Sequence, residues 1–142
     1  MPRKIIYVDD DTDDLLFFEM ALQKVDPSAL LQKFSNPEIF TGKLAEIEAT
    51  ESLIFLDINM PLKNGFQVLK EIRQKYSAEK LPVIMLSTSD NENTITVARE
   101  FGASAYAVKP NDISDLINLL KKLLTKDWHK SSPGKDGFLY SR

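Results

Sequence analysis

The chain contains no cysteine and only one histidine, His129. Without cysteine it can form no disulfide bond, no thiol nucleophile and no zinc site built on thiolates. A single histidine provides neither a histidine-rich metal site nor an evident Ser–His dyad. We interpret His129 as a solvated residue, since it follows the last predicted helix. The chemistry of this protein must therefore rest on other side chains.

The sequence also lacks an excess of positive charge and a long apolar run. Its 18 Lys and Arg residues stand against 21 Asp and Glu residues, for a formal net charge of -3. This balance argues against a general nucleic-acid binder or a binder of anionic membranes. No apolar run approaches the roughly 18 residues needed to cross a bilayer, and no secretory signal precedes the first strand-like segment. We expect a cytoplasmic protein with neither nucleic acid nor membrane as a partner.

The composition suits one globular domain. The 142 residues are 43% hydrophobic and 27% charged, enough to bury a core without metals or disulfides. Short apolar runs alternate with helical patterns along the chain, and all but the second run are continuously apolar. Such runs are typical of strands buried on both faces of a parallel sheet. We expect strands at Ile5–Val8, Leu30–Phe34, Leu53–Leu56, Val83–Leu86 and Ala105–Val108.

Helical periodicity fills the segments that follow these strands. Asn36 and Pro37 form a cap and a first-turn proline, which predict a helix through about Glu48. Strands alternating with helices imply right-handed crossovers and helices on both faces of the sheet. The expected helices are Thr12–Val25, 37–48, Gly65–Tyr76, the segment from the Asn91 cap to Phe101, and Ile113–Leu124.

The periodic pattern stops after Leu124. We expect residues 1–125 to form the domain and residues 126–142 an irregular C-terminal tail. The tail contains Trp128 and a Phe138-Leu139-Tyr140 sequence, which are too apolar for a purely solvated segment. We therefore predict a turn at Pro133-Gly134 that folds the aromatic end back onto the domain or onto a partner.

Polar residues follow four of the predicted strands. Asp9 and Asp10 follow the first and Asp57 the third, while Ser87 and Lys109 follow the last two. In an open parallel sheet these ends lie at one edge, where ligands bind. Neighbouring strands are about 4.8 Å apart, so the three carboxylates are expected to lie close together.

Carboxylates this close repel one another unless a cation lies between them. Mg²⁺ is the natural cation for such a set of oxygen ligands. Lys109 adds a second positive charge and Ser87 a hydroxyl. A carboxylate nucleophile, a divalent metal, a lysine and a hydroxyl together suit phosphoryl transfer. The sequence therefore predicts an acyl phosphate on an aspartate.

Four motifs lie at the strand ends, in this order: Val8-Asp9-Asp10, Leu56-Asp57-Ile58-Asn59-Met60-Pro61 with Gly65, Met85-Leu86-Ser87-Thr88 and Ala105-Tyr106-Ala107-Val108-Lys109-Pro110. Together they resemble the receiver domain of bacterial response regulators, the CheY-like superfamily, over roughly residues 3–125. The resemblance implies a doubly wound, flavodoxin-like α/β fold with five helices and a five-stranded parallel sheet of order 2-1-3-4-5.

The resemblance also implies a role for each site residue. Asp57 is the expected phosphoacceptor. It is also expected to hold Mg²⁺ together with Asp10 directly, Asp9 through water, and the backbone carbonyl of Asn59. Ser87 and Lys109 would each bind a phosphoryl oxygen.

Two further expectations come from the last motif. Tyr106 matches the family's switch aromatic, which turns inward as the hydroxyl of Ser87 moves toward the phosphoryl group. The Lys109–Pro110 peptide bond is expected to be cis, as is typical in the family.

The resemblance implies a single-domain response regulator of a two-component phosphorelay, rather than a turnover enzyme. The expected donor of the phosphoryl group is a histidine kinase or a phosphotransfer protein. A downstream protein or a second copy would dock on the face made by the fourth helix, the fifth strand and the last helix.

Two alternatives remain open. One is an aspartate-nucleophile phosphatase of the haloacid-dehalogenase type, although Asp57-Ile58-Asn59 lacks the usual acid two residues after the nucleophile. The other is a scaffold receiver that acts without phosphorylation, which the full set of site residues disfavours.

Overall fold

The computed structural model describes residues 3–130 and 137–141 and contains one sheet of parallel strands. The strand order is β2-β1-β3-β4-β5-β6. The predicted order 2-1-3-4-5 is confirmed, and a short sixth strand extends the sheet beside β5. The strands are β1 (Lys4–Val8), β2 (Leu30–Phe34), β3 (Ser52–Leu56), β4 (Val83–Ser87), β5 (Ala105–Val108) and β6 (Leu139–Tyr140).

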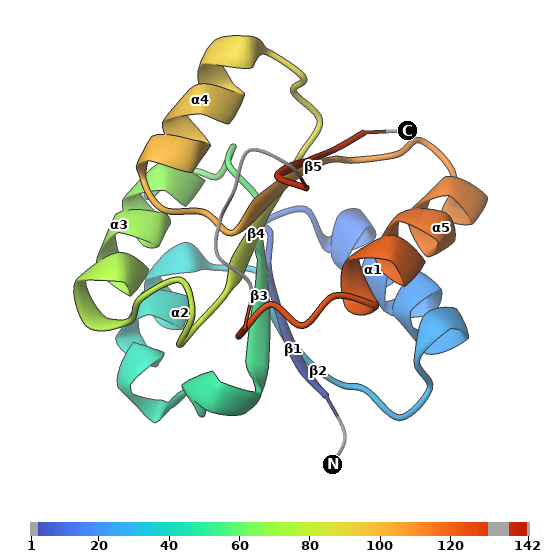
Figure 1. Cartoon of the computed structure of the whole chain (residues 1–142), viewed down its shortest axis with the longest axis horizontal. Helices are drawn as coiled ribbons and strands as arrows, with labels where there is room; N and C mark the ends of the chain where they lie inside the picture. The colour runs from blue at the N-terminus through green and yellow to red at the C-terminus, as the bar shows by residue number, and fades with distance from the viewer. Residues whose placement is uncertain (1–2, 131–136, 142) are drawn as a thin grey trace.

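Helices cover both faces of the sheet. Figure 1 shows α1 and α5 together on one face and α2, α3 and α4 on the other. Because side chains alternate along a strand, β3 directs Ile54 and Leu56 into one apolar cluster and Leu53 and Phe55 into the other. This is why its run is continuously apolar. The helices are α1 (Thr12–Val25), α2 (Pro37–Gly42), α3 (Gly65–Lys75), α4 (Glu92–Glu100) and α5 (Ile113–Leu124).

An Asp or Asn side chain caps the N-terminus of each of these five helices. Asp11 accepts hydrogen bonds from the backbone N–H groups of Asp13 and Asp14 at the start of α1. Asn64 forms a reciprocal capping box with Gln67 at the start of α3. The caps fix the loops that leave the carboxyl ends of the strands, where the candidate site lies. The other capping residues are Asn36, Asn91 and Asp112.

The second helix is shorter than predicted. Helix α2 ends at Gly42, and two 3₁₀ turns, Leu44–Glu46 and Ala49–Glu51, replace the expected continuation to Glu48. Glycine is a poor helix former. The 3₁₀ turn also buries Leu44, which is only 2% exposed.

The described parts of the tail pack against the domain. The Trp128 side chain is buried, and its Nε1–H donates a 2.7 Å hydrogen bond to the carbonyl of Leu123 in α5. Phe138 is buried as well, and β6 pairs with β5. The predicted turn at Pro133-Gly134 lies outside the described residues.

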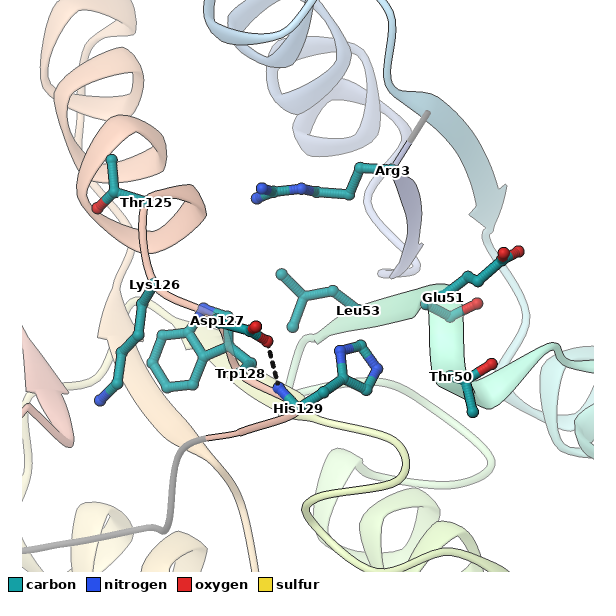
Figure 2. A pocket seen from close by; sticks show the side chains of 10 residues that line it. Arg3, Thr50, Glu51, Leu53, Thr125, Lys126, Asp127, Trp128 and His129 are labelled. Atoms are coloured by element: carbon teal, nitrogen blue, oxygen red, sulfur yellow. Dashed lines mark hydrogen bonds between the residues drawn. The ribbon is translucent and has the colours of Figure 1, made fainter. Parts of the chain in front are cut away.

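A cavity of about 370 Å³ lies at the amino ends of the strands, where the chain leaves α5. Figure 2 shows Arg3, Trp128 and His129 around it, and no predicted site residue lines it. His129 is half-buried here, and its Nε2 lies 2.9 Å from the carbonyl oxygen of Ala49.

Within the described residues, no helix is long and apolar enough to cross a bilayer.

Candidate functional site

The sheet itself positions the polar side chains at its carboxyl edge. The N–H of Asp9 donates to Phe34 O at 3.0 Å, that of Asp57 to Val8 O at 2.9 Å, and that of Lys109 to Ser87 O at 2.8 Å. Asp9, Asp57 and Lys109 each follow a strand directly, yet each still bonds to the neighbouring strand. Their side chains therefore leave the sheet at one edge, held by its rigid backbone.

The carboxylates of Asp9, Asp10 and Asp57 come together at this edge. One oxygen from each lies within 4.8 Å of the others. Asp9 and Asp57 are buried, whereas Asp10 is exposed. Carboxylate oxygens are ligands for hard divalent cations such as Mg²⁺, which also keeps several waters. This donor set fits such a cation, and the exposed Asp10 leaves the site accessible.

Lys109 provides the positive charge of the site. Its Nζ lies 2.8 Å from Asp9 Oδ2, 2.8 Å from Asp14 Oδ2 and 3.3 Å from Asp57 Oδ1. Burial lowers the pKa of Lys109, but hydrogen bonds to Asp14 and Asp9 outweigh it and raise the pKa above the ordinary value. Lys109 is therefore a fixed cation at neutral pH.

Asp57 is the carboxylate whose ionisation is most disturbed. Burial raises its pKa from 3.8 to about 7, the charge of Lys109 opposes this rise, and the charge of Asp9 adds to it. A divalent cation beside the three carboxylates favours their ionised form. A cation held at this edge would therefore favour the ionised form of Asp57.

Hydrogen bonds fix Asp9 from two directions. The hydroxyl of Tyr7 donates to Asp9 Oδ2 at 2.5 Å, and the N–H of Asp11 donates to Asp9 Oδ1 at 3.0 Å. Tyr7 was not among the predicted site residues. Alternation along β1 contained the signal, since residues two apart lie on the same face of a strand.

Asp14 is a second site residue that was not predicted from the sequence. It lies in the first turn of α1, beyond the Asp9-Asp10 motif, and forms an ion pair with Lys109. The two residues are 95 positions apart. No local pattern in the sequence indicates this pair.

Gly65 allows the loop after β3 to return to the site. Its N–H donates to the carbonyl of Ile58 at 2.8 Å. A Cβ atom on Gly65 would overlap the carbonyl oxygen of Asp57 and lie 2.8 Å from the Cα of Ile58. Any side chain here would displace the backbone of Asp57. Leu62, in the same loop, has a φ of 69°, a strained value for a residue other than glycine.

Ser87 and Tyr106 lie behind the charged cluster, and both are buried. The Oγ of Ser87 accepts a 3.2 Å hydrogen bond from the N–H of Ser89, whose carbonyl accepts a 2.7 Å bond from the hydroxyl of Tyr106. Burial raises the pKa of Tyr106, so its hydroxyl stays protonated. The ring of Tyr106 is turned inward in this structure.

Two further expectations concern Asn59 and Pro110. Asn59 lies exposed in the loop after β3, and its role as a carbonyl ligand stays a prediction. The Lys109–Pro110 bond is trans, which corrects the expected cis isomer, because no cis peptide occurs in the described part of the chain. Trans is the lower-energy form of an X–Pro bond.

The fold agrees with comparisons to known proteins. The chain matches the response regulator receiver domain model over residues 5–121. It is similar to the Mn²⁺-bound form of response regulator Rcp1, with 26% identity, a TM-score of 0.72 and coverage of 92% of this chain and 98% of that one. The phosphorylated cyanobacterial phytochrome response regulator RcpA shares 25% identity, with a TM-score of 0.75 and coverage of 93% and 97%.

A more distant structure supports the fold alone. The chemotaxis response regulator CheY4 of Vibrio cholerae is 22% identical, with a TM-score of 0.73, over 87% of this chain and 99% of that one.

Receiver domains are phosphoacceptors rather than turnover enzymes. With its 2-1-3-4-5 strand order, its acidic cluster and a family match over most of its length, this chain belongs to the family of response regulator receiver domains.

Proposed function

We propose that Asp57 accepts a phosphoryl group from a phosphohistidine of a histidine kinase or a phosphotransfer protein. The observation that carries this proposal is the position of Asp57 at the end of β3. It is buried beside Lys109 Nζ at 3.3 Å and clustered with two further carboxylates. A buried carboxylate with a raised pKa, beside a lysine and two further carboxylates, suits nucleophilic attack on phosphorus.

The transfer step follows from the chemistry of the two groups. An Asp57 carboxylate oxygen forms a bond to phosphorus while the P–N bond to the donor histidine breaks. The imidazole leaves with the electron pair of that bond and takes up a proton. Lys109 neutralises charge on the phosphoryl oxygens, and Ser87 donates its hydroxyl hydrogen to one of them.

A divalent cation, Mg²⁺ by its chemistry, would be held by Asp9, Asp10, Asp57 and the carbonyl of Asn59. When bound, it would neutralise the negative charge that accumulates on the transferred phosphoryl group. The carboxylate cluster supports this assignment, as does the Mn²⁺ in the structure of the similar regulator Rcp1.

Mass spectrometry tests the proposal directly. Incubation with acetyl phosphate and Mg²⁺ should add the mass of one phosphoryl group to the intact chain, on the peptide that contains Asp57. Asp57→Asn is the matched control, because the amide has almost the same shape but is a far weaker nucleophile. Labelling of this variant at the parental rate would contradict the assignment.

The same experiment distinguishes the scaffold alternative. An unlabelled parent protein that still binds a kinase would support a receiver that acts without phosphorylation. The haloacid-dehalogenase alternative gains no support, because the family match is to receiver domains.

A further inference from the structure

The C-terminal strand lies on the face where a partner is expected to dock, between α4 and α5 at the edge of β5. In Figure 1 the C-terminal strand runs beside β5 on the side between α4 and α5. Tyr106 pairs with Leu139 and Ala107 with Tyr140, and the N–H of Tyr106 donates to Phe138 O at 2.8 Å. The edge of β5 is therefore occupied by this chain's own residues.

Side chains anchor this strand to the helices on both sides. The Phe138 ring is 1% exposed, and the guanidinium of Arg99 in α4 lies 4.6 Å from its centroid. The Tyr140 ring contacts Trp128 at 6.2 Å between centroids, and Trp128 is bonded to α5. Leu139, by contrast, is 47% exposed. Phe138 and Tyr140 thus provide the specific contacts of an otherwise short strand.

Hydrogen bonds connect the strand to the phosphoacceptor site through Tyr106. Ser89 bonds to Ser87 at 3.2 Å, the Tyr106 hydroxyl bonds to Ser89 at 2.7 Å, and the Tyr106 N–H bonds to Phe138 at 2.8 Å. The rings of Tyr106 and Phe138 belong to one apolar cluster, and both are buried. Because such a cluster is close-packed, outward rotation of the Tyr106 ring would require the cluster that also holds Phe138 to repack.

We propose that the β5 edge between α4 and α5 is a docking site for an extended aromatic segment, filled by residues 138–140 of this chain. Docking of residues 138–140 at this edge and phosphorylation of Asp57 favour each other, because both favour the inward position of the Tyr106 ring. This inference rests on the proposed phosphoacceptor function. Phosphorylation then strengthens strand docking, and it selects partners that recognise the docked strand over partners that need a bare β5 edge.

Amide exchange of the full chain tests the coupling. Beryllofluoride with Mg²⁺ serves as the phosphoryl mimic, and the probe is the Tyr106 amide, which is bonded to Phe138. Loading should slow its exchange by about fivefold or more, at the lower end of typical coupling between two sites. Asp57→Asn, which cannot bind the mimic, should show no change. Unchanged or faster exchange in the loaded parent would overturn the proposal.

Linkage provides a reciprocal test with a matched pair of variants. Phe138→Ala removes the buried anchor and should weaken beryllofluoride binding. The loss of affinity should be at most the factor by which beryllofluoride slows exchange of the Tyr106 amide. Leu139→Ala alters the same strand at its exposed side chain and should leave the affinity within about twofold. Equal affinities in the two variants would contradict the coupling. If Phe138→Ala fails to fold, the exchange measurement on the parent still decides.

Two further readouts separate this inference from its alternatives. ¹⁹F NMR shows whether beryllofluoride binds at all. No bound signal in the parent refutes the phosphoacceptor proposal, whereas a bound signal with unchanged Tyr106 exchange refutes only the coupling. Exchange that slows with increasing protein concentration would show that the strand comes from a second copy, which overturns docking within one chain.

Discussion

At the scale of single residues, burial and charge act in opposite directions on Asp57. Its carboxyl group lies among other acids inside the protein, where the charged form is poorly solvated. Lys109 and a backbone hydrogen bond from Ile58 compensate only in part. Such a site destabilises the folded protein, but it provides a reactive carboxylate and ligands for a cation.

The first prediction concerns the pH dependence of stability in the absence of divalent cations. Folding raises the pKa of Asp57 from 3.8 to about 7, so the folded state binds this proton more tightly than the unfolded chain. The resulting stability is present below pH 4 and is lost as the pH rises through 7. Asp57→Asn cannot ionise, so it should exceed the parent in unfolding free energy by about 1–3 kcal/mol at pH 8 and by less at pH 5.

Urea unfolding of both proteins at pH 5 and pH 8, with a chelator present, measures this difference. Asp13→Asn, an exposed acid in the first turn of α1, controls for the general loss of one negative charge. A stability difference that does not grow with pH would contradict a raised pKa at Asp57.

The second residue prediction concerns Asp14. An ammonium group has three N–H donors, and Asp14 and Asp9 each accept from Lys109, which leaves one donor for Asp57 or its phosphoryl group. Asp14→Asn weakens one of the two bonds that hold Lys109. It should slow phosphorylation by acetyl phosphate roughly tenfold, the effect of about 1.4 kcal/mol.

Asp13→Asn again supplies the matched control, because it removes the same charge from the same helical turn. Its phosphorylation rate should stay within about twofold of the parent rate, as expected for an exposed charge. If both variants were phosphorylated equally slowly, the charge of the helical turn, rather than the contact with Lys109, would determine the rate.

At the scale of elements, a half-buried arginine, Arg73, joins three segments on the side of the sheet that carries α3 and α4. Arg73 in α3 donates through Nε to Gly102 O and through Nη1 to Leu81 O, both at 2.7 Å. Gly102 has a φ of 92° and ends the turn after α4, while Leu81 precedes β4. Burial lowers the pKa of Arg73 to about 10, so it stays charged at neutral pH.

Arg73→Leu should therefore destabilise the protein while leaving phosphorylation of Asp57 intact. The substitution leaves two backbone carbonyls without their charged donor, which should cost about 2–4 kcal/mol. Chemical denaturation measures the loss, and labelling by acetyl phosphate under native conditions measures the activity. Arg99→Leu, on α4, would be expected to cost less, because its ring contact with Phe138 is a weaker interaction. A stability equal to that of the parent would contradict the role assigned to Arg73.

At the scale of the whole molecule, the carboxylate cluster links metal binding to folding. A cation that binds only the folded state stabilises it by mass action, and here it also relieves repulsion among three acids. Mg²⁺ at about ten times its dissociation constant should contribute about 1.4 kcal/mol and raise the Tm by several degrees.

Calorimetry with and without Mg²⁺ tests this prediction. Asp10→Ala should respond much less to Mg²⁺ than the parent, because it lacks one carboxylate ligand. Ca²⁺ and Mn²⁺ titrations indicate how selective the site is. A Tm that ignores millimolar Mg²⁺ in both proteins would show that the cluster binds no metal.

Much of the fold was predictable from the sequence because its signals are local. The apolar run of β3 and the cap and proline before α2 each identify an element within a few residues. The strand ends then locate Asp9, Asp10, Asp57 and Lys109 by topology alone, because parallel strands end at one edge. The end of α2 at Gly42 was less predictable, since helix propensity is weak compared with the burial of Leu44.

The sequence by itself determined the alternation of strands and helices, the family and the acidic cluster. Only the tertiary structure decided which acid joins Lys109 from α1, that Tyr7 fixes Asp9, and that β6 covers β5. The reason is physical. A two-residue strand has no periodicity to detect, and an ion pair across 95 positions has no local signature. Both form because the folded sheet leaves an edge and a charge that distant residues can satisfy.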